Sequence, residues 1–416
     1  MGAFLCIDLK SFYASVECVE RKLNPFTTNL VVADESRGKG AICLAISPKM
    51  KMLGVKNRCR LYEIPPNIDY IIAKPRMSKY IEYSANVYEV YLKYIAKEDI
   101  HVYSIDEAFL DVEPYLKMYK MTPIELAKTI IKDIENTYGI TATAGVGTNL
   151  YLAKVALDIM SKHSVTNIGY LDEEKYKKDL WHHKNLTDFW QIGKGIEKRV
   201  NKHMLFDMYD IANADQKILY KEFGVNAKYL IDHAWGKETC TIKDIKSYKT
   251  KSHSISTSQI LFEDYPFEKT RIVVKEMVEN KSLELVQNDL VTDTVQIYIG
   301  YSKDIIKATG GTGHLISKTN VYSELVKEFL NIYDNTTNKK VPIRRIGISF
   351  LNVEQIQYEQ MNLFIDYEKI KKERDLEKTL AILKQKVGKN KILRGMSLED
   401  GATAVIRNTL IGGHNA

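Results

Sequence analysis

Three acidic side chains follow short apolar segments of the kind that form buried strands. Asp8 comes after residues 4–7, and the adjacent pair Asp106 and Glu107 comes after residues 102–105. An unpaired carboxylate in such a place is costly to bury, so we expect a cation beside it. Mg²⁺ favours a few hard carboxylate ligands, and two Mg²⁺ ions about 3.5–4 Å apart can stabilise the attacking and leaving oxygens of phosphoryl transfer. These residues could therefore support metal-assisted phosphoryl transfer.

A simpler interpretation of the same acids stays open at this point. Acids at strand ends are common, and they often cap helices or pair with lysines. An adjacent Asp-Glu pair is weak evidence for a metal site when taken alone.

The elements that would position these acids are predicted from periodicity. Residues 102–105 and 140–146 are rich in β-branched side chains and predict strands, and residues 1–8 predict a buried strand. Residues 123–138 carry apolar side chains at helical spacing. This strand-helix-strand order indicates an α+β or α/β domain over residues 1 to about 170.

The rest of the chain changes character twice. Residues 170–240 predict helices punctuated by glycine, and the lysine-rich stretch 243–251 predicts a linker. A second α+β unit is predicted from a helix over 267–289 and strands over 252–260, 294–301 and 343–351. After about residue 355 the chain is charged and poor in large apolar residues, which favours a tail with partial helix and disorder.

Composition narrows the function classes. The 416 residues suggest two to four domains, and the net charge of +7 fits a polyanionic partner without requiring one. Five scattered cysteines argue against a disulfide framework or zinc site and favour a reducing cytoplasm. No segment has the length and apolarity of a membrane span, and the N-terminal run lacks the features of a signal peptide.

Five ordered segments resemble the motifs of the Y-family (translesion) DNA polymerases. Asp8 followed by Phe12-Tyr13-Ala14-Ser15-Val16-Glu17 is similar to the first motif, and Ser104-Ile105-Asp106-Glu107-Ala108-Phe109-Leu110-Asp111 is similar to the second. Residues 40–56, 145–154 and 343–348 resemble the fingers segment, the close of the palm and the last strand of the little finger. Within the family, the chain looks nearest to the UmuC-like members of Gram-positive bacteria and their phages or mobile elements.

The resemblance implies an α+β multidomain fold, the right-hand polymerase with palm, fingers, helical thumb and α+β little finger. The implied boundaries are palm 1–17 and 75–168, fingers 18–74, thumb 169–242 with a helix-hairpin-helix, little finger 249–355 and C-terminal tail 356–416. These domains leave no room for a proofreading exonuclease.

The resemblance also assigns the catalytic centre. Asp8, Asp106 and Glu107, helped by the carbonyl of Leu9, would bind two Mg²⁺ ions and catalyse attack of a primer 3′-hydroxyl on a deoxynucleotide. Tyr13 would be the steric gate, whose ring leaves no room for a 2′-hydroxyl; a core tyrosine is the alternative in a chain with 26 tyrosines.

The resemblance implies further contacts with the nucleotide, and this chain departs from the family pattern at some of them. Phe12 would pack beside the gate, and the triphosphate would be held by Ser47, Lys51 and Lys162. Many family members carry Thr and Tyr where this chain has Ala45 and Pro48, so its phosphate contacts differ. Either lysine could instead be a solvated surface residue.

DNA contacts are expected at two places. Gly193 to Gly195 precede a helix whose N–H groups could bind a phosphate, although an ordinary turn has the same pattern. The opening of the second α+β unit could line the template backbone or form a solvated edge strand. The expected contacts are Gly193, Lys194, Gly195, Lys198, Lys251, Ser252, Ser254, Arg344 and Arg345.

Residues 360–364 resemble the peptide that binds the bacterial sliding clamp. Such a peptide would dock apolar side chains in a groove, and the alternative is a segment that packs on its own domain. Its expected contacts are Gln360, Met361, Leu363 and Phe364.

The resemblance therefore implies a low-fidelity polymerase that copies primer-template DNA past damaged bases, in DNA repair and SOS mutagenesis. Its partners would be DNA, deoxynucleoside triphosphates, the sliding clamp and accessory subunits of the damage response. Two rivals remain: a palm-domain nucleotide cyclase, which would not depend on DNA, and a catalytically silent DNA-binding accessory subunit or damage sensor.

Overall fold

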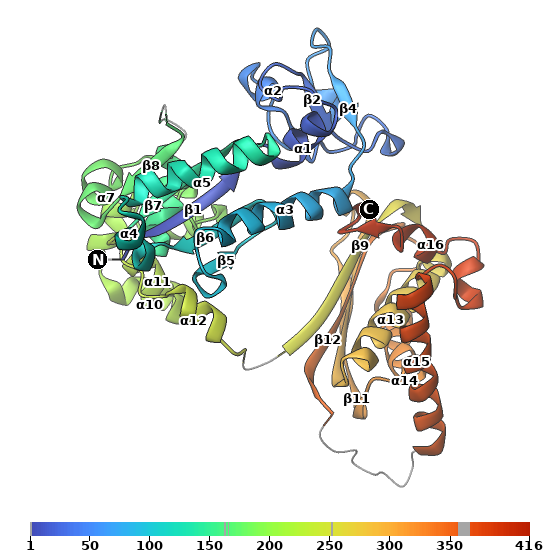
Figure 1. Cartoon of the computed structure of the whole chain (residues 1–416). Coiled ribbons are helices and arrows are strands. Elements are labelled where there is room, and N and C mark those ends of the chain that lie inside the picture. The colour runs from blue at the N-terminus through green and yellow to red at the C-terminus, as the bar shows by residue number, and fades with distance from the viewer. Residues whose placement is uncertain (1, 162–163, 165, 251–252, 357–366) are drawn as a thin grey trace. The chain divides into compact units, whose positions relative to one another are not determined.

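The computed structural model describes residues 2–161, 164, 166–250, 253–356 and 367–416. It divides into two compact units, Met1–Tyr248 and Lys249–Ala416 (Figure 1). Each unit has its own sheets and its own buried residues.

The centre of unit 1 is a five-stranded sheet in the order β5-β6-β1-β7-β8. Its strands are β5 (Ile100–Val102), β6 (Glu107–Asp111), β1 (Phe4–Leu9), β7 (Ala142–Gly147) and β8 (Ile168–Leu171). Strand β1 runs antiparallel to both of its neighbours, and β7 and β8 are parallel. This places the first strand of the chain in the middle of the sheet, where it is buried.

Helices pack on this sheet with their apolar faces against it. The predicted helix over 123–138 is confirmed as α5 (Pro123–Tyr138), which begins at a capping box formed by Thr122 and Glu125. It lies beside α3 (Met77–Leu92) (Figure 1). Helix α6 (Leu150–Val155), followed by a π-helical turn at Ala156–Met160, packs on β7.

Two glycines of β7 allow α6 to lie close to the sheet. A Cβ on Gly145 would collide with the backbone of Ala153 and Leu157, and a Cβ on Gly147 would collide with the backbone of Ala153. Only glycine fits there, so these residues set the height of α6 above the sheet.

A small lobe is inserted between α1 (Phe12–Glu20) and α3. Its three-stranded sheet has the order β3-β2-β4, from Ala45–Ile46, Leu30–Val32 and Ile71–Ala73. The lobe also holds α2 (Pro48–Met52), and its core includes Val31, Ile46 and Met50.

The remainder of unit 1 is helical. Its helices are α4 (Glu113–Tyr119), α7 (Glu173–Leu180), α8 (Lys194–Asn201), α9 (Met208–Asn213), α10 (Gln216–Phe223), α11 (Ala227–Ala234) and α12 (Ile242–Ser247). The predicted linker over 243–251 is wrong at its start, because α12 covers most of it. Thr241 and Asp244 form a capping box there, and Ile242 is buried.

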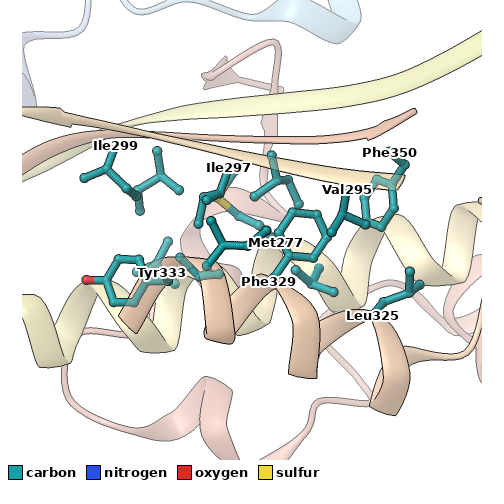
Figure 2. Close-up of a cluster of buried hydrophobic side chains, with 14 of the residues drawn as sticks. Met277, Val295, Ile297, Ile299, Leu325, Phe329, Tyr333 and Phe350 are labelled. Atoms are coloured by element: carbon teal, nitrogen blue, oxygen red, sulfur yellow. The ribbon is translucent and has the colours of Figure 1, made fainter. Parts of the chain in front are cut away.

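Unit 2 is a four-stranded antiparallel sheet with helices on one face. The order is β11-β10-β12-β9, from Thr309–Thr319, Leu290–Tyr301, Ile343–Gln355 and His253–Tyr265. Helices α13 (Phe267–Gln287) and α14 (Tyr322–Thr336) cover the inner face, where Val295, Ile297 and Ile299 meet Met277 and Phe329 (Figure 2). The alternate residues of β10 face away from this core.

The partial helix predicted for the tail is confirmed, but the predicted disorder is wrong for residues 367–416, which are folded as part of unit 2. They form α15 (Tyr367–Val387), α16 (Ala404–Arg407) and a hairpin of β13 (Leu410–Ile411) and β14 (His414–Asn415). Many of their contacts with the rest of unit 2 are polar, and polar contacts leave no apolar pattern in the sequence. Glu377 of α15 is fully buried and accepts a hydrogen bond from the backbone N–H of Tyr322 at the start of α14.

Candidate active site

The three predicted acids meet at one end of the central strands. Antiparallel pairing sets Asp8 of β1 directly opposite Glu107 of β6. The N–H of Leu9 donates to the carbonyl of Asp106 at 2.9 Å, which places Asp106 next to the end of β1. The predicted strand over 102–105 is wrong, however. Strand β5 ends at Val102, and Asp106 and Glu107 stand in the turn into β6 and at its first residue.

Side-chain alternation directs Asp8 and Glu107 to one face of the sheet. Cys6 and Phe109, two residues along each strand, pack there against residues of α6. Lys154 of α6 lies over this face, and its Nζ is 2.8 Å from Oε1 of Glu107 and 3.2 Å from Oδ1 of Asp158. The thiol of Cys6 donates to the same Glu107 oxygen at 3.0 Å.

The acids repel one another electrostatically. Burial, followed by the charges of Asp106 and Glu107, raises the pKa of Asp8 to about 7. The ammonium of Lys154 lowers the pKa of Asp8 but does not compensate for burial and the neighbouring acids. The site therefore carries an excess of negative charge that a divalent cation would neutralise.

The donor set fits a divalent metal by its chemistry. Three acidic residues lie at one strand end, and carboxylate oxygens suit Mg²⁺. Among the residues that the structure describes, no three His, Cys, Asp or Glu side chains stand in a metal-binding geometry. The reason is visible in the contacts, because Glu107 is turned to Lys154 and Asp106 accepts from Ser104 at 2.6 Å.

Tyr13 is the second residue of α1, beside these acids. Its ring stacks on Tyr80 of α3 with centroids 4.3 Å apart and an interplanar angle of 15°. Phe12 is buried behind it, 5.7 Å away between ring centroids. Burial, then the charge of Asp106, raises the pKa of the Tyr13 hydroxyl, while Arg58 lowers it. The half-buried ring thus faces both the acids and the inserted lobe.

The side chain of Ser47, expected to bind phosphate, is bonded within the inserted lobe. This side chain is fully buried, and its Oγ accepts from the N–H groups of Met50 and Leu30 and donates to the carbonyl of Thr28. Ser47 is the N-cap of α2, with no hydrogen-bonding capacity left for a ligand.

Lys51 has the exposure that its expected role requires. It lies close enough to Lys10, at the end of β1, to lower the pKa of Lys10 after the larger effect of burial. The two ammonium groups bring positive charge from the lobe and from the central sheet to one place. Lys162 lies outside the described residues.

The backbone is accessible at the start of α8, where a DNA contact is expected. Gly193 is the N-cap of α8, and no atom lies within 4 Å of a Cβ built on Gly193 or Gly195. Lys194 and Lys198 are exposed on this helix. The N–H groups at its start are therefore sterically accessible.

The unit 2 sheet carries a depression lined mainly by polar side chains. Its volume is about 390 Å³, and its lining includes Ser256, Ser258, Gln296 and Tyr298. Register carries Arg345 to the same face as this depression, opposite Gly300, where it lies 3.6 Å from a carboxylate oxygen of Asp304. Arg344 pairs with Asp264 at 3.3 Å.

The remaining expected contacts are only partly described. Ser254 is exposed near the start of β9. Lys251 and Ser252 lie outside the described residues, as do Gln360, Met361, Leu363 and Phe364 of the expected clamp peptide.

Sequence reasoning missed three basic residues around the acids: Lys10, Arg58 and Lys154. Lys154 is in the motif that closes the palm, so its position could have been noted, but only the fold reveals its ion pair with Glu107. Arg58 is in a loop and has a positive φ of 58°, and no local pattern marks it. Only its proximity to Tyr13 in the folded structure indicates a role at the site.

Comparisons with known proteins agree on the class of protein. The impB/mucB/samB family matches residues 7–158, and the C-terminal domain of the same family matches residues 252–363. A solved Y-family DNA polymerase chimera of Dbh and Dpo4 aligns with a TM-score of 0.65 and 21% identity, covering 85% of this chain and 99% of that one. The fold is therefore the right-hand fold of a Y-family polymerase.

Two full-length relatives come from Bacillus subtilis. The UV-damage repair protein UvrX is 31% identical over 99% of this chain and 97% of its own length. DNA polymerase IV 2 is 28% identical over 98% of this chain and 97% of its own length. This chain belongs to the impB/mucB/samB family of Y-family polymerases. No helix in the described ranges is long and apolar enough to cross a membrane.

Proposed function

We propose that this chain is a DNA-directed DNA polymerase that extends a primer past damaged template bases. The observation that carries the proposal is the register that sets Asp8 opposite Glu107, with Asp106 beside them. The family and the names of the relatives support the same activity, because those relatives are called DNA polymerase IV and a UV-damage repair protein.

Asp8, Asp106 and Glu107, with the carbonyl of Leu9, would hold two Mg²⁺ ions. When bound, the ions would lower the barrier by neutralising charge on the attacking and leaving oxygens. The excess negative charge at Asp8 supports this assignment. Lys154 pairs with Glu107 and keeps its carboxylate over the sheet.

The nucleotide would lie between the acids and the inserted lobe. Tyr13 would meet the sugar, with Phe12 supporting its ring. Lys51 and Lys10 are placed for the triphosphate, and Arg58 is a further candidate because its charge reaches the Tyr13 hydroxyl. Lys162 stays a proposed contact from the family resemblance alone.

Primer-template DNA would contact both units. Backbone N–H groups at Gly193 and Gly195, with Lys194 and Lys198, would bind phosphates without reading sequence. Arg345 and the polar face of the unit 2 sheet would follow the backbone. Arg344, Ser254, Lys251 and Ser252 complete the proposed set.

We propose domain boundaries and partners on the family pattern. Palm, fingers, thumb and little finger would be residues 1–17 with 75–168, 18–74, 169–242 and 249–355. The clamp would bind residues 360–364, accessory subunits would assist in SOS mutagenesis, and the protein would act in the cytoplasm.

Primer extension by the purified protein tests this proposal. With Mg²⁺ and deoxynucleoside triphosphates, the wild type should extend a primer on intact and abasic templates. Asp106→Ala should lose extension by roughly 10³-fold or more, the scale expected when transition-state charge stabilisation is removed. Absence of extension on every template, also when clamp and accessory proteins are supplied, would sink the enzyme assignment.

A further inference from the structure

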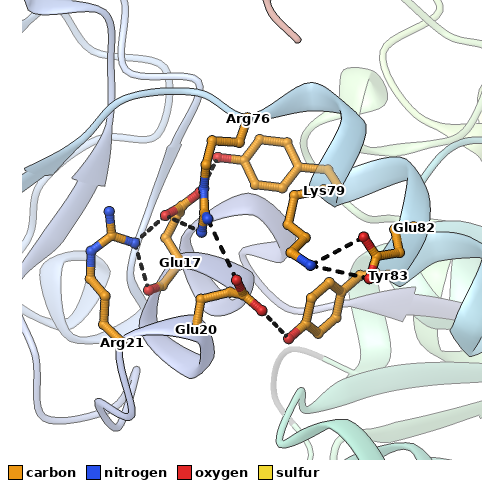
Figure 3. Close-up of polar contacts among 8 residues, drawn as sticks. Glu17, Glu20, Arg21, Arg76, Lys79, Glu82 and Tyr83 are labelled. Atoms are coloured by element: carbon orange, nitrogen blue, oxygen red, sulfur yellow. Dashed lines mark hydrogen bonds and ion pairs between the residues drawn. The ribbon is translucent and has the colours of Figure 1, made fainter.

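Glu17 is a carboxylate with no exposed surface in the middle of α1. Arg76 binds it through Nε at 2.9 Å and Nη2 at 3.0 Å, and Arg21 binds it from the other side (Figure 3). The hydroxyl of Tyr80 donates to Oε1 at 2.8 Å. Burial raises the pKa of Glu17, but the hydrogen bonds from these three partners outweigh it, so the pKa is lowered overall.

The partners of Glu17 stand at the two stems of the inserted lobe. Arg21 is the first residue after α1, where the chain leaves for the lobe, and Arg76 is the N-cap of α3, where the chain returns. The same Arg76 reaches Glu20 at 3.5 Å, and Glu20 accepts from Tyr83 at 2.8 Å. Glu17 therefore ties the exit and the return of the lobe to one helix (Figure 3).

Tyr80 connects this network to Tyr13. One face of its ring stacks on Tyr13, and its hydroxyl is held by Glu17. Phe12 touches the same ring edge-on, with centroids 6.5 Å apart. Tyr80 is fully buried, so Tyr13 rests on a ring that is fixed by packing and by one charge-assisted hydrogen bond.

We infer that Glu17 and Tyr80 are positioning residues that set the sugar selectivity of Tyr13. The inference rests on the proposed function, in which Tyr13 meets the sugar of the incoming nucleotide. Tyr80 cannot shift without leaving the buried Glu17 short of a donor, which is costly. The ring of Tyr13 is therefore held in a fixed position on the ring of Tyr80. A nucleotide whose 2′-hydroxyl would fit only if the Tyr13 ring moved away is rejected.

The same arrangement links selectivity to the inserted lobe. A displacement of either lobe stem would act on Arg21 or Arg76, and through Glu17 on Tyr80. Sugar discrimination thus depends on Tyr13, Tyr80 and Glu17, none of which is a metal-binding acid.

The test compares deoxynucleotide and ribonucleotide insertion by matched variants of the whole protein. Tyr80→Phe keeps the stacked ring and removes only the hydroxyl that binds Glu17. Tyr83→Phe is the control, because it removes a hydroxyl from the rim of the same network without touching Tyr80 or Tyr13. Glu17→Gln weakens the anchor itself, and Tyr13→Ala gives the full loss of the gate. Thermal unfolding shows which variants are folded.

Tyr80→Phe should lower the ratio of kcat/KM for deoxynucleotide over ribonucleotide about five-fold, the effect of one lost hydrogen bond of about 1 kcal/mol. The change should lie in a lower KM for the ribonucleotide, and Tyr83→Phe should keep the wild-type ratio. Glu17→Gln should lower the ratio too, and the double variant should not exceed the larger single effect, because both changes weaken the contact between Tyr80 and Glu17.

Other results would overturn the inference. One is a Tyr80→Phe ratio equal to that of the wild type while Tyr13→Ala loses selectivity. Others are equal effects of Tyr83→Phe and Tyr80→Phe, or an unchanged ratio in Tyr13→Ala. If Glu17→Gln does not fold, the two tyrosine variants decide alone. Failure of the proposed function is distinct, since the wild type would then insert no nucleotide at all.

Discussion

At the scale of single residues, the acids are defined by what surrounds them. Asp8, Asp106 and Glu107 are close enough for the last two to raise the pKa of the first, yet Glu107 is bonded to Lys154. A bound cation would compete with Lys154 for the same carboxylate. Metal affinity is therefore expected to be modest before substrate phosphates add their own ligands.

Binding of Mg²⁺ without DNA tests the acids directly. Saturation at ten times the Kd should stabilise the wild type by about 1.4 kcal/mol, and Asp8→Asn should remove this gain. Asp111→Asn is the matched control, since this residue lies at the other end of β6, opposite Phe4. The measurement is thermal unfolding over a Mg²⁺ titration, and an equal gain in Asp8→Asn would contradict the assignment.

Much of the site could be predicted at this scale, because acids and the gate tyrosine lie in contiguous motifs. The interactions of Lys154, Arg58 and Glu17 could not be predicted, because each of these interactions joins residues that are distant in the chain. Ser47 was assigned to phosphate from its position, and its burial as an N-cap depends on the fold of the lobe.

At the scale of elements, the contact between β7 and α6 positions Lys154 over the acids. Gly145 and Gly147 leave no space for a side chain because the backbone of α6 lies against them. The sequence shows the glycines, but their steric reason is visible only once the helix is in place.

Gly147→Ala should therefore displace α6 and destabilise unit 1. Forcing a methyl group against backbone is expected to cost about 3 kcal/mol, the upper range for overpacked sites. Denaturant unfolding checks this against Gly195→Ala, where a Cβ meets no atom within 4 Å. Equal stability of the two variants would show that α6 is not held as described.

Glu377, at the contact of α15 with α14, makes the stability of the fold depend on pH. Burial, then the charge of Glu373, raises the pKa of Glu377 to about 7 from an ordinary 4.5. Folded Glu377 thus keeps a proton that the unfolded chain has released, so its contribution is complete below pH 4.5 and is lost as the pH rises to about 7.

Glu377→Gln should remove this pH dependence. Relative to wild type, its free energy of unfolding should increase by up to roughly 3 kcal/mol between pH 4.5 and 7.5. Urea unfolding across this range is the measurement. Glu368→Gln, exposed on the same helix, should run parallel to the wild type, and a parallel curve for Glu377→Gln would refute the argument.

At the scale of the whole molecule, polar surfaces and net charge suit a polyanionic partner. The net charge is +7, and the open face of unit 2 carries small polar side chains with Arg345. The order of sheets and helices was predictable from motifs and periodicity. The fold of residues 367–416 was not, because polar contacts such as Glu377 with Tyr322 leave no periodic signal.

Affinity for primer-template DNA should depend steeply on salt. Contact with six or more phosphates would weaken binding about 10³-fold between 50 and 200 mM salt. Arg345→Ala should reduce the slope of log affinity against log salt by about one, as expected for one lost phosphate contact. Fluorescence anisotropy measures both, and a nearly flat dependence would rule out the backbone-binding surfaces proposed above.

The central claim is that the acids catalyse nucleotide insertion rather than bind DNA. Its most direct test is the single-turnover insertion rate on a bound primer-template, for the wild type and Asp106→Asn. The rate should be at least about 10³-fold lower in the variant, equivalent to roughly 4 kcal/mol, with DNA affinity within about three-fold of the wild type. Insertion at the wild-type rate by Asp106→Asn would contradict it.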